Sequence, residues 1–164
     1  MAFIVTRALA SDAPSLAALH RQAFPRGWSA ADFEASCADA NRAVLKATDG
    51  AALLGLAVLQ FAAGEAEILS IAVAKEARRR GIATCLLENA IGICMEKLIS
   101  CIYLEVAESN NAALSLYGKA GFHMLARREN YYQAASPAPE AALVMRRGIG
   151  NGVARFDRQR DGIR

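Results

Sequence analysis

The sequence predicts a domain that contains both helices and strands (α/β, or more narrowly α+β). Its mixed, mostly antiparallel sheet has about seven strands, with helices on both faces. Apolar runs typical of strands alternate with amphipathic helical segments along the chain. A strand–helix–strand unit in the middle implies a right-handed parallel crossover. Apolar runs separated by turn residues flank this unit and imply antiparallel neighbours on either side. The length of 164 residues suits one such domain with its own core.

The expected elements follow one another without an internal repeat or a linker. Their order is strand, helix, helix, three strands, helix, strand, helix and two strands. They cover residues 3–7, 11–24, 29 onward, 42–48, 51–60, 67–73, 82–93, 101–106, 110–120, 122–128 and 141–146.

The first helix has clear start signals. Residues 11–14 (SDAP) contain a capping residue and a proline near the first turn, where proline is tolerated. Helical spacing then places Leu16, Leu19 and His20 on one face. The helix is expected to run to about Phe24.

The break after this helix contains Trp28, the only tryptophan of the chain. Ser29 and Asp32 have the spacing with which a helix N-terminus is capped, so a second helix begins there. The tryptophan has two interpretations. It is either an aromatic anchor between the two helices or an aromatic side chain that faces a substrate.

Turn signals separate the later elements. Asp49-Gly50 between two apolar runs is the strongest short hairpin signal in the chain. Residues 62–65 turn the chain into the central strand. Gly121 is a helix stop signal, and residues 136–139 (SPAP) mark an exposed loop before the last strand.

We expect the fold to be organised around residues 66–93. There a buried strand leads into the basic glycine turn 78–83 (RRRGIA), and an amphipathic helix follows. Such a turn predicts a phosphate site, because the first N–H groups of a helix have no partner within it and the helix dipole favours negative charge. Gly81 lets the backbone approach an anion, and the arginines add positive charge. The alternative is a turn that carries only solvated charge.

Composition and charge restrict the class of protein. Hydrophobic residues make up 54% of the chain and charged residues 21%, which is typical of a globular protein rather than a disordered one. No apolar run is long enough to span a bilayer, and the N-terminus lacks the apolar core of a signal peptide. A soluble cytoplasmic protein is therefore expected. The net charge of +3 is too small to predict nucleic-acid binding by itself.

The four cysteines are expected to be reduced thiols. They form no C-x-x-C pair, and neither His20 nor His123 lies at metal-ligand spacing from them, so we expect no metal site. The arginine-rich segment 148–164 has little apolar material to bury. We therefore expect the domain to cover residues 1–147 and the tail to be disordered.

On these motifs the chain resembles the GCN5-related N-acetyltransferase (GNAT) superfamily. In that family the pattern R/Q-x-x-G-x-G/A lies between a strand and a helix and holds the pyrophosphate of acetyl-coenzyme A. Residues 78–83 match this pattern, with Ala83 at the last position, which the family allows. The resemblance covers roughly residues 3–147. It implies an acetyl-coenzyme A-dependent N-acetyltransferase, an acyltransferase whose central parallel strands splay apart to admit the cofactor arm.

Within this superfamily the chain is similar to the bacterial ribosomal-protein alanine N-acetyltransferases (RimI-type). Four stretches support this similarity. They are FP and WS before the second helix (24–29), IAV before the arginine turn (71–73), LEV with the later SN, LY and GF (104–122), and RRENYY (127–132). The chain departs from the subfamily pattern where Arg26 and Gly27 separate proline from tryptophan, and where Gln133 follows the tyrosine pair. Both departures lie in segments that resemble substrate-facing loops. The similarity implies that the acceptor is the N-terminal alanine of a small-subunit ribosomal protein.

Glu105 is the best candidate for the general base. It is a lone carboxylate in an apolar strand, on the same face as Tyr103 and opposite Leu104. Desolvation there would raise its pKa, which suits a base. The alternative is an edge-strand glutamate that faces water. Glu67 and Glu108 are rival candidates, and Glu67 alternatively positions a water molecule.

Tyr117 is the candidate acid beside the departing sulfur. Proton transfer from tyrosine (pKa about 10) to a thiolate (about 8.5) is uphill, so we expect a hydrogen bond that stabilises the thiolate. The alternative is a tyrosine of the core. Asn110, two turns earlier on the same helix, binds the pantetheine arm, caps the helix, or does both. A backbone N–H near Val73 is expected to polarise the acetyl carbonyl.

The resemblance implies the remaining site residues. The cofactor-binding residues are Ile71, Ala72, Val73, Arg78, Arg79, Arg80, Gly81, Ile82, Ala83, Thr84, Asn110 and Tyr117. The acceptor-binding residues are Trp28, Glu67, Tyr131 and Tyr132, of which the two tyrosines alternatively end an amphipathic strand.

The expected partners are acetyl-coenzyme A and a protein or peptide N-terminus, such as that of a ribosomal protein. We expect no membrane, no direct nucleic-acid binding, and a monomer or weak dimer. Direct transfer in a ternary complex is expected. Two other functions stay open: the same chemistry on a small amine such as a polyamine or an aminoglycoside, and a non-catalytic acyl-coenzyme A-binding module. The presence of both Glu105 and Tyr117 argues against the second.

Overall fold

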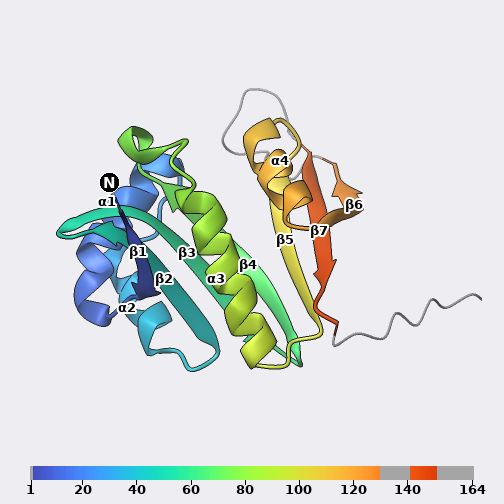
Figure 1. Ribbon diagram of the computed structural model, residues 1–164, viewed down its shortest axis with the longest axis horizontal. Helices are drawn as coiled ribbons and strands as arrows, with labels where there is room; N and C mark the ends of the chain where they lie inside the picture. The colour runs from blue at the N-terminus through green and yellow to red at the C-terminus, as the bar shows by residue number, and fades with distance from the viewer. Residues whose placement is uncertain (1, 130–140, 151–164) are drawn as a thin grey trace, which may run out of the picture.

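A computed structural model describes residues 2–129 and 141–150 and contains the predicted strands and helices in the predicted order (Figure 1). Within these residues seven strands form one sheet in the order β1-β2-β3-β4-β5-β7-β6. The strands are β1 (Ile4–Arg7), β2 (Arg42–Asp49), β3 (Ala52–Ala62), β4 (Glu65–Val73), β5 (Cys101–Ala107), β6 (His123–Arg128) and β7 (Ala142–Gly148). The helices are α1 (Ala13–Ala23), α2 (Ala30–Ala38), α3 (Ile82–Glu96) and α4 (Asn111–Lys119), and the short 3-10 turns η1 (Ala10–Asp12) and η2 (Lys75–Ala77) precede α1 and α3.

Neighbouring strands are antiparallel except for the central pair, β4 and β5, which is parallel. Helix α3 makes the crossover between these two strands, as a parallel pair requires. The mixed, mostly antiparallel sheet and its parallel centre confirm the predicted fold class.

Helices cover both faces of the sheet (Figure 1). Helices α3 and α4 pack on one face, where Leu86 of α3 shares a core with Ile68 and Leu104 of the central strands. Helices α1 and α2 pack on the other face, around Leu16 and Phe33. Because successive side chains of a strand point to opposite faces, these two cores show on which side each strand residue lies.

Local signals fix the ends of the elements. Asp49-Gly50 turns β2 into β3, with Gly50 in the left-handed region at φ 69°. Ser29 and Asp32 form the predicted capping box of α2, in which the Ser29 N–H donates to Asp32 Oδ2 at 2.7 Å and the Asp32 N–H donates to Ser29 Oγ at 3.2 Å. Helix α4 ends at Lys119 with Ala120 as its C-cap, and the predicted stop residue Gly121 follows directly.

Gly55 determines how closely α3 approaches the sheet. A Cβ atom at this position of β3 would lie 3.0 Å from Ile82 Cγ2 and 3.1 Å from Leu86 Cδ1, both on α3. It would also lie 3.0 Å from the carbonyl oxygen of Ala72 on β4. The missing side chain therefore lets the first turn of α3 rest directly on the sheet.

Strand β4 contains a β-bulge at Leu69. Val58 of β3 pairs with Ser70, whereas the next residue, Leu59, pairs with Ile68. Leu69 is thus an extra residue in β4, and such a residue bends its strand and disrupts the ladder locally.

The central strands separate where this bulge occurs. The pairing of β4 with β5 ends at Ile68 opposite Leu104. Beyond this pair, β4 continues to Val73 and β5 continues to Ala107 without pairing to each other. Figure 1 shows the two strands diverging. The bulge explains the predicted splay, because it turns β4 away from its parallel neighbour.

All four cysteines are free thiols, with Cys94 and Cys101 buried and Cys37 and Cys85 half-buried. No helix in the described part of the chain is long and apolar enough to cross a membrane. Strand pairing continues to the end of β7, where the Ile149 N–H donates to the Ser100 carbonyl at 2.8 Å. Residues 151–164 of the predicted tail lie outside the described residues.

Candidate active site

The gap between the diverging ends of β4 and β5 exposes backbone N–H groups of β4. Along a strand, successive N–H groups point to opposite edges. The Ala74 N–H donates to the Leu54 carbonyl of β3 at 2.9 Å, so the Val73 N–H points away from β3 and into the gap. The Ile71 N–H, two residues earlier, shares this direction. A carbonyl oxygen placed in the gap would therefore find a fixed N–H donor at Val73.

The basic turn leads from this gap into the first turn of α3. Gly81 is the N-cap of the helix, with a left-handed backbone at φ 79°, and its missing Cβ would face open space. The first hydrogen bond of α3 runs from the Cys85 N–H to the Gly81 carbonyl at 3.0 Å. The N–H groups of Ile82, Ala83 and Thr84 therefore have no partner within the helix. Together with the positive end of the helix dipole, these free N–H groups are suited to an anion.

The three arginines of the turn have different surroundings. Arg78 Nε donates to the Val73 carbonyl at 3.4 Å, and Arg80 Nη2 lies 3.7 Å from Asp49 Oδ2. These contacts tie the turn to the end of β4 and to the β2–β3 hairpin. Arg79 is exposed and has a left-handed backbone at φ 64°, which is uncommon for a residue with a side chain. Among the described acids none pairs with Arg79, so its charge is available to a bound anion.

Asn110 and Tyr117 lie one after the other along α4. The Asn110 side-chain oxygen accepts the Ala113 N–H at 3.1 Å, so this residue caps the helix. Tyr117 is buried beside Phe122, with ring centroids 5.8 Å apart, in the same core cluster as Val106 of β5. Burial raises the pKa of Tyr117 to about 12. Its hydroxyl is therefore a neutral hydrogen-bond donor at ordinary pH.

Glu67 and Glu105 lie on the face of the sheet opposite α3. Their sequence neighbours Ile68 and Leu104 are buried in the core on the α3 side, so strand alternation turns both glutamates to the other face. The pKa of Glu67 is raised, mainly by partial desolvation and also by the negative charge of Glu105. Glu105 is itself bound by β6, where Arg128 Nη1 donates to its Oε1 at 2.5 Å. The two carboxylates thus form an interacting pair beside the gap.

The structure bears on two alternatives for the general base, the edge-strand interpretation of Glu105 and the candidate Glu108. Strand β5 is not an edge strand, because β7 pairs along its whole length on the side opposite β4. The interpretation of Glu105 as an edge-strand glutamate is therefore wrong. Glu108 accepts two hydrogen bonds from Arg127, at 2.9 and 2.8 Å, and these bonds lower its pKa. Glu108 is consequently a weaker proton acceptor than Glu67.

Trp28 packs between the two N-terminal helices. Its ring centroid lies 5.4 Å from that of His20 and 5.5 Å from that of Phe33. Its backbone N–H donates to His20 Nδ1 at 3.0 Å. These contacts are those of an aromatic anchor, the first of its two interpretations, and contact with a substrate stays a prediction.

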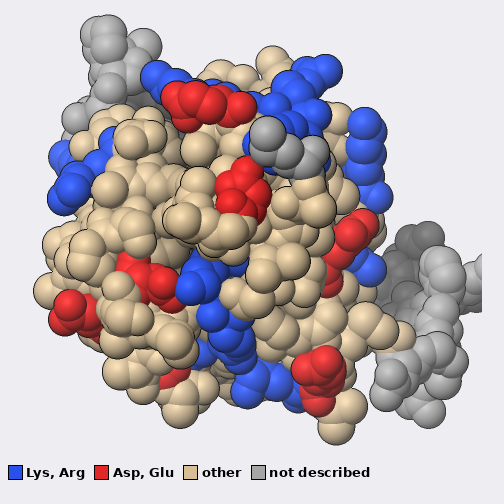
Figure 2. Space-filling view, turned by 60° about the vertical axis from the view of Figure 1, so that its left-hand side comes forward, with Lys and Arg blue, Asp and Glu red and all other residues tan. Residues whose placement is uncertain are grey.

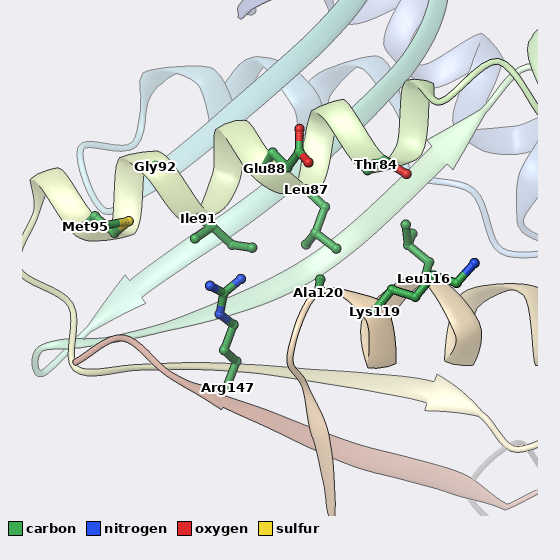
Figure 3. A pocket seen from close by; sticks show the side chains of 10 residues that line it. All are labelled: Thr84, Leu87, Glu88, Ile91, Gly92, Met95, Leu116, Lys119, Ala120 and Arg147. Carbon is green, nitrogen blue, oxygen red and sulfur yellow. The ribbon is translucent and has the colours of Figure 1, made fainter. Parts of the chain in front are cut away.

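A cavity of about 450 Å³ lies between α3 and α4 (Figure 3). Arg147 projects from β7 toward α3 at its floor, and Lys119 lines its α4 side, opposite the single acid Glu88. The cavity adjoins the basic turn at Thr84. Its lining residues are Thr84, Leu87, Glu88, Ile91, Gly92, Met95, Leu116, Lys119, Ala120 and Arg147.

The predicted site residues that the structure describes lie in four places. One is α4, where Asn110 caps the helix and Tyr117 is buried. Those of β4 and the basic turn meet at the gap and the start of α3, and Glu67 lies with Glu105 on the opposite face of the sheet. Trp28 lies at the α1–α2 junction, and Tyr131 and Tyr132 lie outside the described residues. The pairing of Arg128 with Glu105 was not predicted, because the sequence offered only an Arg-Arg pair before the tyrosines.

Charges of both signs occur on the surface. Figure 2 shows a band of Lys and Arg side chains across the lower part of one face, with Asp and Glu side chains on both sides of it. Among the residues that the structure describes, no group of three or more His, Cys, Asp or Glu side chains is arranged to hold a metal ion.

Comparisons with known proteins identify the family of the chain. Residues 13–122 match the acetyltransferase (GNAT) family. A Salmonella typhimurium protein named [Ribosomal protein bS18]-alanine N-acetyltransferase is 36% identical over 101 residues, which are 62% of this chain and 68% of that protein. The Escherichia coli K12 protein of the same name is 28% identical over 134 residues, which are 82% and 90% of the two chains.

Solved structures show the same fold. The crystal structure of the ribosomal-protein-S18-alanine N-acetyltransferase from Escherichia coli matches with a TM-score of 0.83 at 26% identity, over 93% of this chain and 99% of that chain. Arabidopsis thaliana NAA60 in complex with acetyl-CoA matches with a TM-score of 0.80 at 19% identity, over 90% and 99% of the two chains.

Proposed function

This chain belongs to the acetyltransferase (GNAT) family, and we propose that it transfers the acetyl group of acetyl-coenzyme A to the N-terminal alanine of ribosomal protein bS18. The family makes it an N-acetyltransferase. The acceptor is proposed from the relatives that carry this activity in their names. The observation that carries the reaction is the gap between β4 and β5, which has the Val73 N–H at its edge and the carboxylates of Glu67 and Glu105 beside it.

Acetyl-coenzyme A would bind along the basic turn and through the gap. Its pyrophosphate suits the free N–H groups at the start of α3 and the exposed charge of Arg79. The pantetheine arm would then lie between the diverging strands, so that the acetyl oxygen accepts the Val73 N–H. This bond strengthens as negative charge develops on that oxygen, and it therefore favours attack on the thioester carbon.

The acceptor must lose a proton before it attacks. A protein α-amine has a pKa near ~7.8, so roughly 10% is neutral at pH 7, whereas a lysine amine near ~10.4 is well under ~0.1% neutral. A carboxylate can serve the first more easily than the second. We assign the base to Glu105 and keep Glu67 as its rival, because the raised pKa of Glu67 brings it closer to that of the amine.

Transfer would be direct, with both substrates bound. The neutral amine attacks the acetyl carbon, a C–N bond forms and the C–S bond breaks, and the proton that the nitrogen then releases ends on the coenzyme A thiolate. The electron pair of that bond leaves on the coenzyme A sulfur, to which Tyr117 would donate a hydrogen bond. Initial rates should then fit a sequential pattern, and a ping-pong pattern would contradict the ternary complex.

Tyr117→Phe is expected to lower kcat roughly 10- to 100-fold, because a hydrogen bond to a charged group is worth about 1.5–3 kcal/mol. With the pKa of Tyr117 at about 12, the hydroxyl stays protonated below that pH. The shape of the pH–rate profile should therefore be unchanged in the variant. Tyr103→Phe is the matched control, because Tyr103 donates to Glu65 at 3.1 Å on the opposite face of the sheet. Equal kcat in the Tyr117 variant and the wild type would assign Tyr117 to the core alone.

The acceptor is tested with two peptides and mass spectrometry. One peptide has the N-terminal sequence of bS18 with a free alanine, and the other has the same sequence with a blocked N-terminus and its lysines free. We expect acetylation of the first only, with acetyl-coenzyme A consumed in equal amount. Equal acetylation of the blocked peptide, or a higher kcat/KM for a polyamine, would overturn the proposal.

A further inference from the structure

His20 joins the α1–α2 loop to the bulged part of β4. Its ring is buried, with 3% of the residue exposed. Nδ1 accepts the backbone N–H of Trp28 at 3.0 Å, and Nε2 lies 3.1 Å from Ser70 Oγ. Its ring centroid lies 4.5 Å from that of Phe24 and 5.6 Å from that of Phe33. The imidazole thus contacts the loop, α2 and β4 at once.

These contacts fix the protonation state of the ring. A backbone N–H can only donate, so Nδ1 must be the unprotonated nitrogen. The ring proton is then on Nε2, which donates to Ser70 Oγ. In the described part of the chain, the groups that contact the ring are Trp28 and Phe24 from the loop, Phe33 from α2 and Ser70 from β4, and none of these four carries a charge. Desolvation is accordingly the cause of the lowered pKa of His20.

The position of Ser70 connects this contact to the gap. Ser70 directly follows the bulge at Leu69, and β4 reaches Val73 three residues later. Its hydrogen bond to α1 places it on the face of the sheet that also carries Glu67. The imidazole therefore links the loop to β4 on the face from which an acceptor amine would meet the two carboxylates.

We propose that His20 is a positioning residue for the acceptor, and that its neutral ring holds the Trp28 loop in place over the bulged end of β4. This inference rests on the proposed function, because it takes the face of Glu67 and Glu105 as the acceptor side. His20 would touch neither substrate. It acts through the backbone of Trp28 and the hydroxyl of Ser70.

Two substitutions test the two hydrogen bonds of His20 separately, the one from the Trp28 N–H and the one to Ser70 Oγ. In His20→Gln the amide group reaches the position of Nε2 and can donate to Ser70, but the Trp28 N–H loses its acceptor. In His20→Asn the amide oxygen reaches the position of Nδ1 and can accept from Trp28, but Ser70 loses its donor. We expect His20→Gln to raise the KM for the acceptor about tenfold, as for a buried donor left unpaired. His20→Asn should raise it less, and neither should change the KM for acetyl-coenzyme A.

Ser36→Ala is the matched control. Ser36 is a buried hydroxyl of α2 that donates to the Asp32 carbonyl at 2.8 Å and accepts from Arg42. Its loss should lower the stability of the same half of the molecule without a selective change in the KM for the acceptor. Acetyl-coenzyme A and the free-alanine bS18 peptide are the substrates, and the KM values are measured below the unfolding temperature of each variant.

A second measurement does not depend on the acceptor. Amide hydrogen exchange of Trp28, followed by NMR in the absence of substrates, should be faster in His20→Gln and close to wild type in His20→Asn. If the wild type fails to acetylate the bS18 peptide, the proposed function is wrong, and the exchange result still tests the link. Equal Trp28 exchange in both variants, or equal rises in the KM for both substrates, would make His20 a core residue without a positioning role.

Discussion

Replacement of Glu67 and Glu105 together by glutamine is expected to lower kcat for N-terminal acetylation by roughly 10²–10⁴-fold, the range that a general base contributes. Both carboxylates lie on the face opposite α3, and the charge of one raises the pKa of the other. The double variant leaves neither carboxylate of the pair to accept the amine proton. Glutamine preserves the size of each side chain, so the effect should appear in kcat more than in the KM for acetyl-coenzyme A.

The single variants separate the two carboxylates by pH dependence. A carboxylate accepts a proton only when it is ionised. If Glu67 is the base, its raised pKa places the acidic limb of kcat/KM above the ordinary carboxyl range. Glu105→Gln removes one cause of that shift, so the limb should move to lower pH. If Glu105 is the base, the loss of activity should instead follow Glu105→Gln.

Glu65→Gln is the control for this series, because Glu65 lies on the same strand and face as Glu67 and accepts a hydrogen bond from the Tyr103 hydroxyl.

A loss of activity through unfolding can be distinguished from a loss of catalysis, because Glu67→Gln is expected to change stability in the favourable direction. Folding raises the pKa of Glu67, so the fold disfavours its ionised form, and stability is lost as pH rises through the raised value. Glu67→Gln should therefore be at least as stable as the wild type at neutral pH. A kcat near that of the wild type in the double variant would remove both residues from the role of base.

Ala83→Asp is expected to raise the KM for acetyl-coenzyme A roughly 100- to 1,000-fold. Ala83 is the second residue of α3, and its N–H is one of those without a partner in the helix. A carboxylate there would compete with the pyrophosphate for the same N–H groups and repel it. Two unit charges ~4 Å apart interact by about 4 kcal/mol at an effective dielectric constant of about 20, which gives this range.

The same substitution should not destabilise the fold. A negative side chain in the first turn of a helix is favourable by about 0.3–1 kcal/mol. Binding and stability are thus expected to change in opposite directions, which simple misfolding cannot produce. Ala83→Asn is the neutral control and should retain most of the affinity. Thermal unfolding and titration with coenzyme A test both expectations, and an unchanged KM in Ala83→Asp would exclude this turn as the pyrophosphate site.

The elements and their order could be predicted from the sequence because their signals are local. Asp49-Gly50 marked the hairpin, Ser29 and Asp32 marked the start of α2, and the glycine turn 78–83 preceded the predicted helix α3. Each of these signals acts through residues that are adjacent along the chain. The basic turn could be assigned an anion site for the same reason.

The parts that could not be predicted depend on strand order and register. The sequence could not tell whether the strand of Glu105 lay at an edge, because the order β4-β5-β7-β6 brings the last strand inside the sheet. Arg128 reaches Glu105 only through the pairing of β6 with β7 and of β7 with β5. No glycine or other turn residue at Leu69 indicates the bulge in the sequence. The contact of His20 with Ser70, the residue after the bulge, could therefore not be predicted either.

The glycine beneath α3 has a consequence for mutational tolerance. Gly55 lies inside β3, far from the basic turn along the chain, and even a methyl group there would press on Ile82 and Leu86. The backbone oxygen of Ala72 lies 3.0 Å away in another direction, so the side chains on α3 would have to shift. Gly55 therefore influences the position of the helix that follows the basic turn, although its own atoms are not part of that turn. Tolerance to substitution at position 55 is therefore limited by its contact with the helix, not by its place along the chain.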